Sequence, residues 1–380
     1  MLKIQYVSDV HGQFKLIKRD PSADVLVVAG DWCDGMPNIS SLLEWPIPVV
    51  YVLGNHESYH NDTDDIIIKL KQKTAGTNIR VLEKDVWIYR GVRFIGCTGW
   101  TDMCNTDPWI ITQAAGAMSD YKFIKSEKWL KDPLHNAMFH NAFRNLPIHT
   151  YQPGNLHPLI VSAKHVQARQ FLERALAEPF DGATVVVTHH PPSPRALRHS
   201  GKWLPEPHPD MNFALLHDAF PKAGWHRLGT YASRLDDIIT MHQPTAWIHG
   251  HIHQRMEYFV HNTPVLMNAI GHQSSTRLAP AVFHTNSLAW WKKREVLINL
   301  TSKHHQWIQT WVLPAIKRDD ISVDLWTPHA YRLHLDALYE AISLGANISI
   351  PQSLSFDTEA FWLDEFEKIS QRLILPKHYS

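Results

Sequence analysis

The stretch AWIHGHIHQ (residues 246–254) begins with three apolar residues and ends with histidines around a glycine. Its apolar part is typical of a short strand that is buried in a sheet. His251 and His253 follow directly, where the strand would leave the sheet. In α/β proteins, ligands bind beyond the carboxyl ends of the strands, so this stretch predicts a functional site at a strand end.

The same pattern, an apolar run that ends in polar residues, recurs along the chain. Other apolar runs that stop at Gly, Asp, Asn or His are LKIQYVSDVHG (2–12), ADVLVVAGDWCD (23–34), IPVVYVLGNHE (47–57), GVRFIGCTGW (91–100) and GATVVVTHHPP (182–192). Amphipathic helical patterns lie at 162–178 and 230–243. Because strands alternate with helices, the sequence predicts an α/β fold.

The motif-bearing pattern defines a predicted catalytic domain over residues 1–280. Within it, residues 101–160 and 191–229 have an irregular order and contain Trp, His and Pro, so we expect insertions or loops over the strand ends. Residues 281–380 lack the pattern and are predicted to form an accessory extension that binds a partner or forms an oligomer. Two helices are expected in this extension, over 329–345 and 357–375.

Composition restricts the functions that fit the chain. Lys+Arg and Asp+Glu both total 37, so no broad basic field attracts nucleic acid. The three cysteines are odd in number, which indicates free thiols in a reducing compartment. No apolar run approaches the length of a membrane span, and no secretory signal is visible. We therefore expect a cytoplasmic protein without membrane contact.

Every predicted strand end carries side chains that can bind a metal ion. They are Asp9 and His11; Asp31 and Asp34; Asn55, His56 and Glu57; His189 and His190; and His251 and His253. This mixture of carboxylates, an amide and imidazoles suits Mn, Fe or Zn, whereas calcium or magnesium favours oxygen ligands. With 26 histidines in the chain, a single one is a weak signal, and the spacing carries the prediction.

The spacing has a physical reason. In extended backbone, residues i and i+2 point to the same side, so Asp9 and His11 are expected to reach one ion together. His251 and His253 are expected to share a pocket, with Gly250 allowing backbone to approach without a Cβ. His249, between the strand and this pair, is expected to be structural.

The set of candidate ligands exceeds what one ion needs. Two ions about 3.5–4 Å apart would use it better, with one carboxylate bridging them. Asp31 is the candidate for this bridge, because its strand end lies between the other two early ones.

The motifs DVH, GDWCD, GNHE, THH and GHIH, in this order, resemble those of the calcineurin-like metallophosphoesterase superfamily. The resemblance covers roughly residues 1–275 and is closest to bacterial members whose substrates are often unassigned; GWTD and MSDYKFI are also similar to stretches of these relatives. It implies a four-layer α/β/β/α metallophosphoesterase sandwich with a dinuclear centre at one edge.

The resemblance also implies roles for single residues. One metal ion would take Asp9, His11, Asp31 and His253. The other would take Asp31, Asn55, His189 and His251. His56 would lie near the leaving-group oxygen, and either Asp34 or Glu57 is expected to orient its ring. Asp34 and His190 are expected to fix the ligands beside them.

These features predict hydrolysis of a phosphate ester by hydroxide that two divalent ions activate, with His56 assisting the leaving group. The Ser/Thr phosphatase branch has a phosphate-gripping arginine after its second motif, where this chain has Gly35 and Met36. A phosphodiester is therefore favoured over a monoester. The alternatives are a phosphomonoesterase, a nuclease that uses WWKKRE (290–295), and a scaffold on the same fold, which would be expected to lack some ligands.

Overall fold

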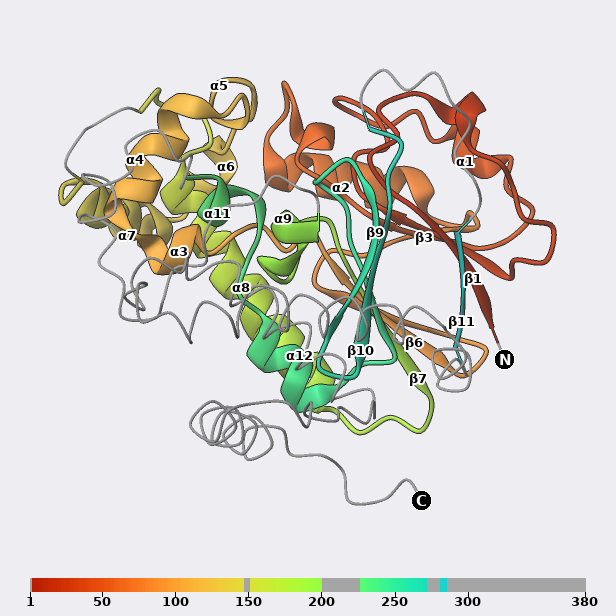
Figure 1. Ribbon diagram of the computed structural model, residues 1–380. Coiled ribbons are helices and arrows are strands. Elements are labelled where there is room, and N and C mark those ends of the chain that lie inside the picture. The colour runs from red at the N-terminus through yellow and green to blue at the C-terminus, as the bar shows by residue number, and fades with distance from the viewer. Residues whose placement is uncertain (1, 147–150, 200–225, 272–280, 286–380) are drawn as a thin grey trace, which may run out of the picture. The chain divides into compact units, whose positions relative to one another are not determined.

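Two β-sheets face each other in the computed structural model, which describes residues 2–146, 151–199, 226–271 and 281–285 (Figure 1). The first sheet has the strand order β11 (Ala281–His284), β1 (Lys3–Val7), β2 (Val25–Ala29), β3 (Val49–Val52) and β4 (Ile79–Val81). Its strands are parallel except β11, which pairs antiparallel with β1. β2 and β3 are buried along their whole length, as strands covered on both faces require.

The second sheet is also mostly parallel. Its order is β5 (Asp85–Tyr89), β6 (Val92–Cys97), β7 (Ala183–Thr188), β8 (Ala246–Ile248), β10 (Thr263–Asn268) and β9 (Arg255–Val260). Only its two edge pairs, β5 with β6 and β9 with β10, are antiparallel. Each predicted strand that precedes a polar motif is therefore found.

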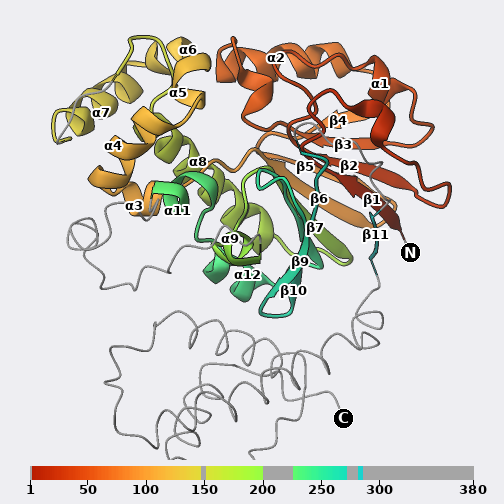
Figure 2. The same cartoon turned by 45° about the horizontal axis from the view of Figure 1, so that its top comes forward.

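Helices cover the outer face of each sheet. α1 (Ser40–Leu43) and α2 (Thr63–Thr74) lie over the first sheet, as Figure 2 shows. α8 (Pro158–Ala177), α9 (Arg195–His199) and α12 (Asp236–His242) lie against the second. The inner faces of the sheets contact each other through β2 with β7 and β3 with β6. The predicted α/β/β/α sandwich is thus confirmed.

The segment 101–160 carries short helices, drawn in gold in Figure 1. They are α3 (Met103–Thr106), α4 (Pro108–Ala117), α5 (Asp120–Phe123), α6 (Glu127–Leu130) and α7 (Pro133–Phe143). The two longer helices, α4 and α7, each begin with a proline that follows a capping aspartate. The side chains of Asp107 and Asp132 accept hydrogen bonds from backbone N–H groups in the first turn. His157 and Pro158 begin α8 in the same way.

The helix expected over 230–243 is interrupted. α11 (His226–Tyr231) precedes the interruption and α12 follows it. Between them, the backbone N–H groups of Ser233 and Leu235 donate to the carbonyls of Pro191 and Pro192 instead of to a helical turn. Contacts with a distant loop therefore override the local periodicity.

The described residues belong to one unit of the chain, Met1–Asn286. β11 belongs to the first sheet although it follows residue 280, where the sequence places the end of the catalytic domain. We therefore propose a boundary near residue 286 and an accessory extension beyond it. The expected helices at 329–345 and 357–375, the stretch 290–295 and residues 200–225 lie outside the described part. Within that part, no helix is long and apolar enough to cross a bilayer.

Candidate metal centre

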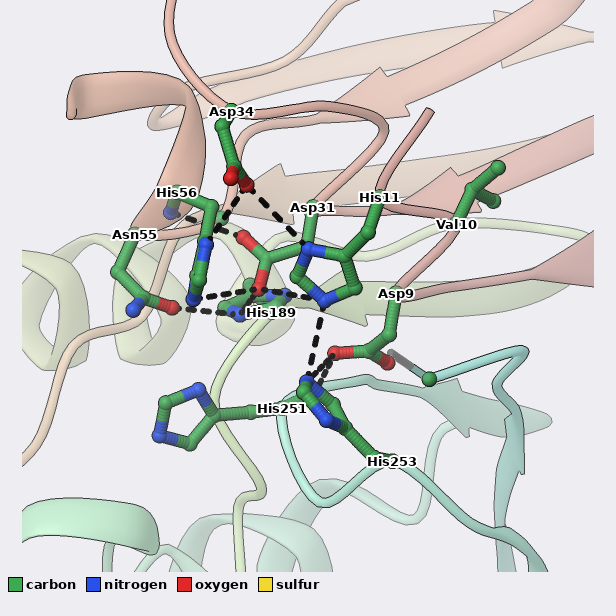
Figure 3. Close-up of polar contacts among 12 residues, drawn as sticks. Asp9, Val10, His11, Asp31, Asp34, Asn55, His56, His189, His251 and His253 are labelled. Carbon is green, nitrogen blue, oxygen red and sulfur yellow. Dashed lines mark hydrogen bonds and ion pairs between the residues drawn. The ribbon is translucent and has the colours of Figure 1, made fainter. Parts of the chain in front are cut away.

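The ends of five strands converge at one place. β1, β2 and β3 are neighbours in the first sheet, and β7 and β8 are neighbours in the second. The side chains that follow them gather around Asp31, as Figure 3 shows. The residues brought together are Asp9, His11, Asp31, Asp34, Asn55, His56, His189, His251 and His253.

Two clusters of potential ligands share Asp31. The first contains Asp9, His11, Asp31 and His253, and the second contains Asp31, His189 and His251; in each, the ligand atoms lie within 4.8 Å of one another. Asn55 adjoins the second cluster, because its Oδ1 is 3.0 Å from His189 Nε2. These groupings coincide with the two sets that the family resemblance implies.

Asp31 lies at the centre of the site. Its Oδ2 is 3.3 Å from Nε2 of His189, 3.8 Å from Nε2 of His11 and 4.0 Å from Nε2 of His56. The carboxylate is fully buried, and its Oδ1 accepts a hydrogen bond from the backbone N–H of His56 at 2.9 Å. Burial alone would raise the pKa of Asp31, but the imidazoles, His189 foremost, hold it well below its usual value.

The first cluster brings several acceptor atoms together. Nε2 of His11 and Nε2 of His253 are 3.1 Å apart, and Nε2 of His253 is 3.5 Å from Asp9 Oδ1. Burial raises the pKa of Asp9 to about 6, and the nearby charge of Asp31 acts in the same direction. A cation at this place would relieve the repulsion between the two carboxylates.

The donor set fits divalent metal ions. Within the described residues, Asp9 Oδ2 and His251 Nε2 are buried atoms without a hydrogen-bond partner. Such atoms are costly to bury unless a ligand satisfies them. Burial lowers the pKa of His251 well below its usual value, which favours the neutral imidazole that binds metals. Carboxylates combined with imidazoles suit Mn, Fe and Zn.

The backbone at the site is left-handed, not extended. The φ angles are 51° at Asp9, 46° at His11, 53° at Asp31, 77° at His251 and 58° at His253. The expectation that extended backbone points each i and i+2 pair to one side is therefore wrong. Asp9 and His11 still reach one cluster, whereas His251 and His253 reach different ones.

Hydrogen bonds between the strand ends hold these unusual conformations. The backbone N–H groups of Val10 and His11 donate to Asp31 O at 2.8 and 3.0 Å, and His251 N–H donates to Asp9 Oδ1 at 2.8 Å. Non-glycine residues in the left-handed region are strained, and such residues persist where the surroundings determine them, often at functional sites.

Gly250 allows the close approach that the sequence predicts. A Cβ at this position would lie 2.7 Å from Ala29 O, 2.9 Å from Asp9 Oδ2 and 3.0 Å from His189 Nδ1. No larger residue fits here without movement of the site.

Asp34 and His56 form a pair at the rim of the site. Nδ1 of His56 is 2.8 Å from Asp34 Oδ1, and Nδ1 of His11 is 3.4 Å from the same oxygen. Burial opposes the charged form of His56, but the carboxylates of Asp31 and Asp34 outweigh it and raise its pKa. Because Asp34 engages Nδ1, Nε2 is the nitrogen of His56 that faces Asp31.

Glu57 does not orient His56, which corrects one of the two alternatives. Its carboxylate is fully buried and accepts hydrogen bonds from the backbone of Asp31, Trp32 and Gly54 and from the Tyr51 hydroxyl. Burial, with the charge of Asp31, raises the pKa of Glu57 to about 7. Glu57 therefore fixes the loops that present Asp31 and Asn55.

Two further histidines are buried beside the site. His190 lies with its ring centroid 4.3 Å from that of His251, and its Nδ1 is 3.3 Å from Thr98 O. His249 contacts Tyr258, with 3.4 Å between its Nε2 and the tyrosine hydroxyl. His249 is in none of the ligand clusters of the described residues, as expected.

Asp120 is a site residue that the sequence reasoning missed. It lies at the start of α5 in the segment 101–160, and its Oδ1 accepts hydrogen bonds from Asn55 Nδ2 at 3.0 Å and from the Tyr59 hydroxyl at 2.9 Å. The stretch MSDYKFI, which is similar to stretches of bacterial relatives, contains this residue and was the available signal.

Comparisons with solved structures give distant likenesses. The phosphopantetheinyl hydrolase PptH from Mycobacterium tuberculosis has 16% identity and a TM-score of 0.44, over 73% of this chain and 95% of that one. GAP50, the anchor in the inner membrane complex of Plasmodium, has 10% identity and a TM-score of 0.31, over 74% and 77%.

A comparison with curated proteins finds no match. The model of the calcineurin-like phosphoesterase family, in contrast, matches residues 2–255, which include every strand end that contributes to the site. The chain therefore belongs to the calcineurin-like phosphoesterase family and is a hydrolase that acts on phosphoric ester bonds.

Proposed function

We propose that the protein hydrolyses phosphodiesters with two divalent metal ions, of which Mn, Fe and Zn suit the donor set. The observation that carries this proposal is the position of Asp31, a buried carboxylate that belongs to both clusters of candidate ligands. A carboxylate that belongs to both clusters would be a ligand to both ions of such a pair.

The family typically binds divalent metals, and two groups of candidate ligands have Asp31 in common. One ion would be held by Asp9, His11, Asp31 and His253. The other would be held by Asp31, Asn55, His189 and His251. Ions bound there would activate a water molecule and offset the negative charge that develops on the phosphoryl oxygens.

The protein's own contribution to proton transfer is assigned to His56. Asp34 holds Nδ1 of this ring at 2.8 Å, so Nε2 is directed to the site. From Nε2, His56 would donate a proton or a hydrogen bond to the oxygen of the leaving group. Assistance of this kind accelerates a reaction by about 10²–10⁴-fold.

The preference for diesters rests on the second motif. Gly35 and Met36 follow Asp34, so this part of the chain supplies no guanidinium to bind the additional charge of a monoester. The nuclease alternative depends on residues 290–295, so a polynucleotide is included among the substrates that are measured.

The proposal is tested by measuring metal content and hydrolysis in parallel. We expect the wild-type chain to retain two ions of Mn, Fe or Zn and to cleave bis(p-nitrophenyl) phosphate faster than p-nitrophenyl phosphate. Asp31→Ala is expected to lose both ions and the activity, because it removes the shared ligand. His251→Ala is expected to lose one ion and most of the activity.

Two variants serve as controls. His140→Ala and Asp181→Ala remove exposed side chains outside the ligand clusters, and both should match the wild type. Wild-type activity in Asp31→Ala would contradict the metal site. Faster cleavage of the monoester would contradict the diester preference alone, and cleavage confined to a polynucleotide would favour the nuclease.

A further inference from the structure

We propose that Asp120 is a positioning residue that fixes the Asn55 side chain with its oxygen toward the metal centre. The inference rests on the proposed function, because it concerns the ion that Asn55 would bind. It assigns a specific role to a residue of the segment 101–160, which the sequence predicts as an insertion or loop over the strand ends.

The amide of Asn55 has two chemically different ends that must face different partners. Its nitrogen can only donate hydrogen bonds, whereas its oxygen can only accept them or bind a cation. Asn55 is buried, with 2% of its surface exposed, and its oxygen lies 3.0 Å from His189 Nε2. A rotated amide would place an N–H₂ group, which cannot bind a metal, beside Asp31 and His189.

Asp120 selects one of these two orientations. Its Oδ1 lies 3.0 Å from Asn55 Nδ2 and is an acceptor, so it requires the nitrogen end of the amide. The oxygen end must then face the opposite side, where the second ligand cluster lies. The orientation thus follows from the chemistry of the partner at each end.

Asp120 is itself held firmly. It is 5% exposed, and the Tyr59 hydroxyl donates to the same Oδ1 at 2.9 Å. The strand-like bridge between Tyr59 and Ile124, with the hydrogen bond from His60 N–H to Phe123 O at 2.8 Å, ties its helix to the segment after Asn55. The carboxylate therefore cannot follow Asn55 if the amide rotates.

The same carboxylate supports the ring beside His56. The Tyr59 ring is stacked on the imidazole of His56, with centroids 4.3 Å apart and an interplanar angle of 22°. One oxygen of Asp120 thus fixes a candidate ligand and a neighbour of the proposed acid.

The inference is tested by titrating the full-length, metal-free chain with Mn²⁺ and determining the affinity of each ion. Asp120→Leu is expected to lower the affinity for the second ion by about 10–100-fold, the usual effect of losing a residue that orients a ligand. The first ion should bind as in the wild type, since the oxygen of Asn55 lies beside His189, which is assigned to the second ion. Asp120→Asn retains an oxygen acceptor and should bind both ions within about threefold of the wild type.

Lys122→Ala is the matched control, because this exposed residue lies on the same helix. Tyr59→Phe removes one hydrogen bond to Asp120 but keeps the ring. It should lower the affinity for the second ion by a smaller factor than Asp120→Leu. If Asp120→Leu does not fold, the metal affinities of Tyr59→Phe test the inference instead.

The outcomes separate the inference from the proposed function. If Asp120→Leu lowers the affinities for both ions equally, or for neither, the inference is overturned while the dinuclear site stands. A Tyr59→Phe variant with unchanged affinities, in the absence of a folded Asp120→Leu, would overturn it as well. A wild-type chain that binds fewer than two ions would overturn both.

Discussion

At the scale of single residues, His56 is the side chain whose proposed role depends on the leaving group. Its ring is held from one side by Asp34 and stacked on Tyr59 on its face, while 15% of the side chain stays exposed. In the proposed mechanism this ring contacts the leaving-group oxygen of the substrate and is not a ligand of either ion. Its loss should therefore affect proton transfer more than metal binding.

We expect His56→Gln to retain both ions and to lose about 10²–10⁴-fold in kcat for a diester with an alkyl leaving group, because that oxygen needs a proton. The loss should be much smaller for a nitrophenyl leaving group, which departs as a stable anion. Steady-state kinetics on both substrates, with metal analysis, measure the difference. Equal losses on the two substrates would exclude a role for His56 in protonation.

The position of Gly250 is constrained sterically, because its neighbours leave no space for a side chain. Gly250→Ala would force a Cβ against Ala29 O at 2.7 Å and Asp9 Oδ2 at 2.9 Å. We expect a loss of about 1–3 kcal/mol in the free energy of unfolding, the usual range for overpacking, together with weaker metal binding. Chemical denaturation and a metal titration provide the two readouts.

Gly116→Ala is the matched control for Gly250→Ala. Gly116 lies in α4, and a Cβ there would meet nothing within 4 Å. This substitution should stabilise the chain by about 0.5–1 kcal/mol, because alanine has the higher helix propensity. A Gly250→Ala variant as stable as the wild type would show that the strand ends can move apart.

At the scale of elements, the strands and their polar ends could be predicted, because each apolar run stops at its motif. The left-handed backbone at Asp9, His11 and His251 could not, since hydrogen bonds between loops from different strands impose it. The contact of Asp120 with Asn55 spans 65 residues and depends on how the segment 101–160 folds back. The periodicity and spacing of residues do not reveal such a contact, and the likeness of MSDYKFI to stretches of bacterial relatives was the signal for Asp120.

The end of α8 shows a further element-scale contact that local sequence does not reveal. Arg93, in β6, donates from Nη1 to the carbonyls of Ala175 and Glu178 at 3.1 and 2.7 Å, and from Nε to Thr184 Oγ1 at 3.1 Å. The last carbonyls of a helix have no partner within the helix itself. A strand of the second sheet thus supplies the cap of the helix that covers it.

Replacing Arg93 by Met should keep the aliphatic part of the side chain and remove the cap. We expect the free energy of unfolding to fall by about 1–3 kcal/mol, because carbonyls at the helix end lose their donor. The exposed Arg80→Met variant should stay within about 0.5 kcal/mol of the wild type. Urea denaturation measures both, and unchanged stability of Arg93→Met would mean that water replaces the guanidinium at no cost.

At the scale of the whole catalytic unit, the candidate metal centre lies where the two sheets meet. The bridge between Ser8 and Ala269, and the hydrogen bond from Gly271 N–H to Asp9 O at 2.9 Å, join the end of β1 to the end of β10. Asp9, His11, Asp31 and Asn55 follow strands of the first sheet, and His189, His251 and His253 follow strands of the second. Ions at this place would therefore link the sheets as well as support catalysis.

Metal binding should accordingly raise the stability of the fold. A ligand that binds only the native state at 100 times its Kd adds about 2.7 kcal/mol to the free energy of unfolding, so Mn²⁺ should raise the unfolding temperature and EDTA should reverse the effect. Asp31→Ala, which lacks the shared ligand, should unfold at the same temperature in both conditions. Mg²⁺ and Ca²⁺ should have smaller effects than Mn²⁺, because imidazoles make up most of the second cluster. Thermal unfolding followed by circular dichroism distinguishes the cases, and a wild-type unfolding temperature that is the same with Mn²⁺ and with EDTA would rule out ions that hold the two sheets together.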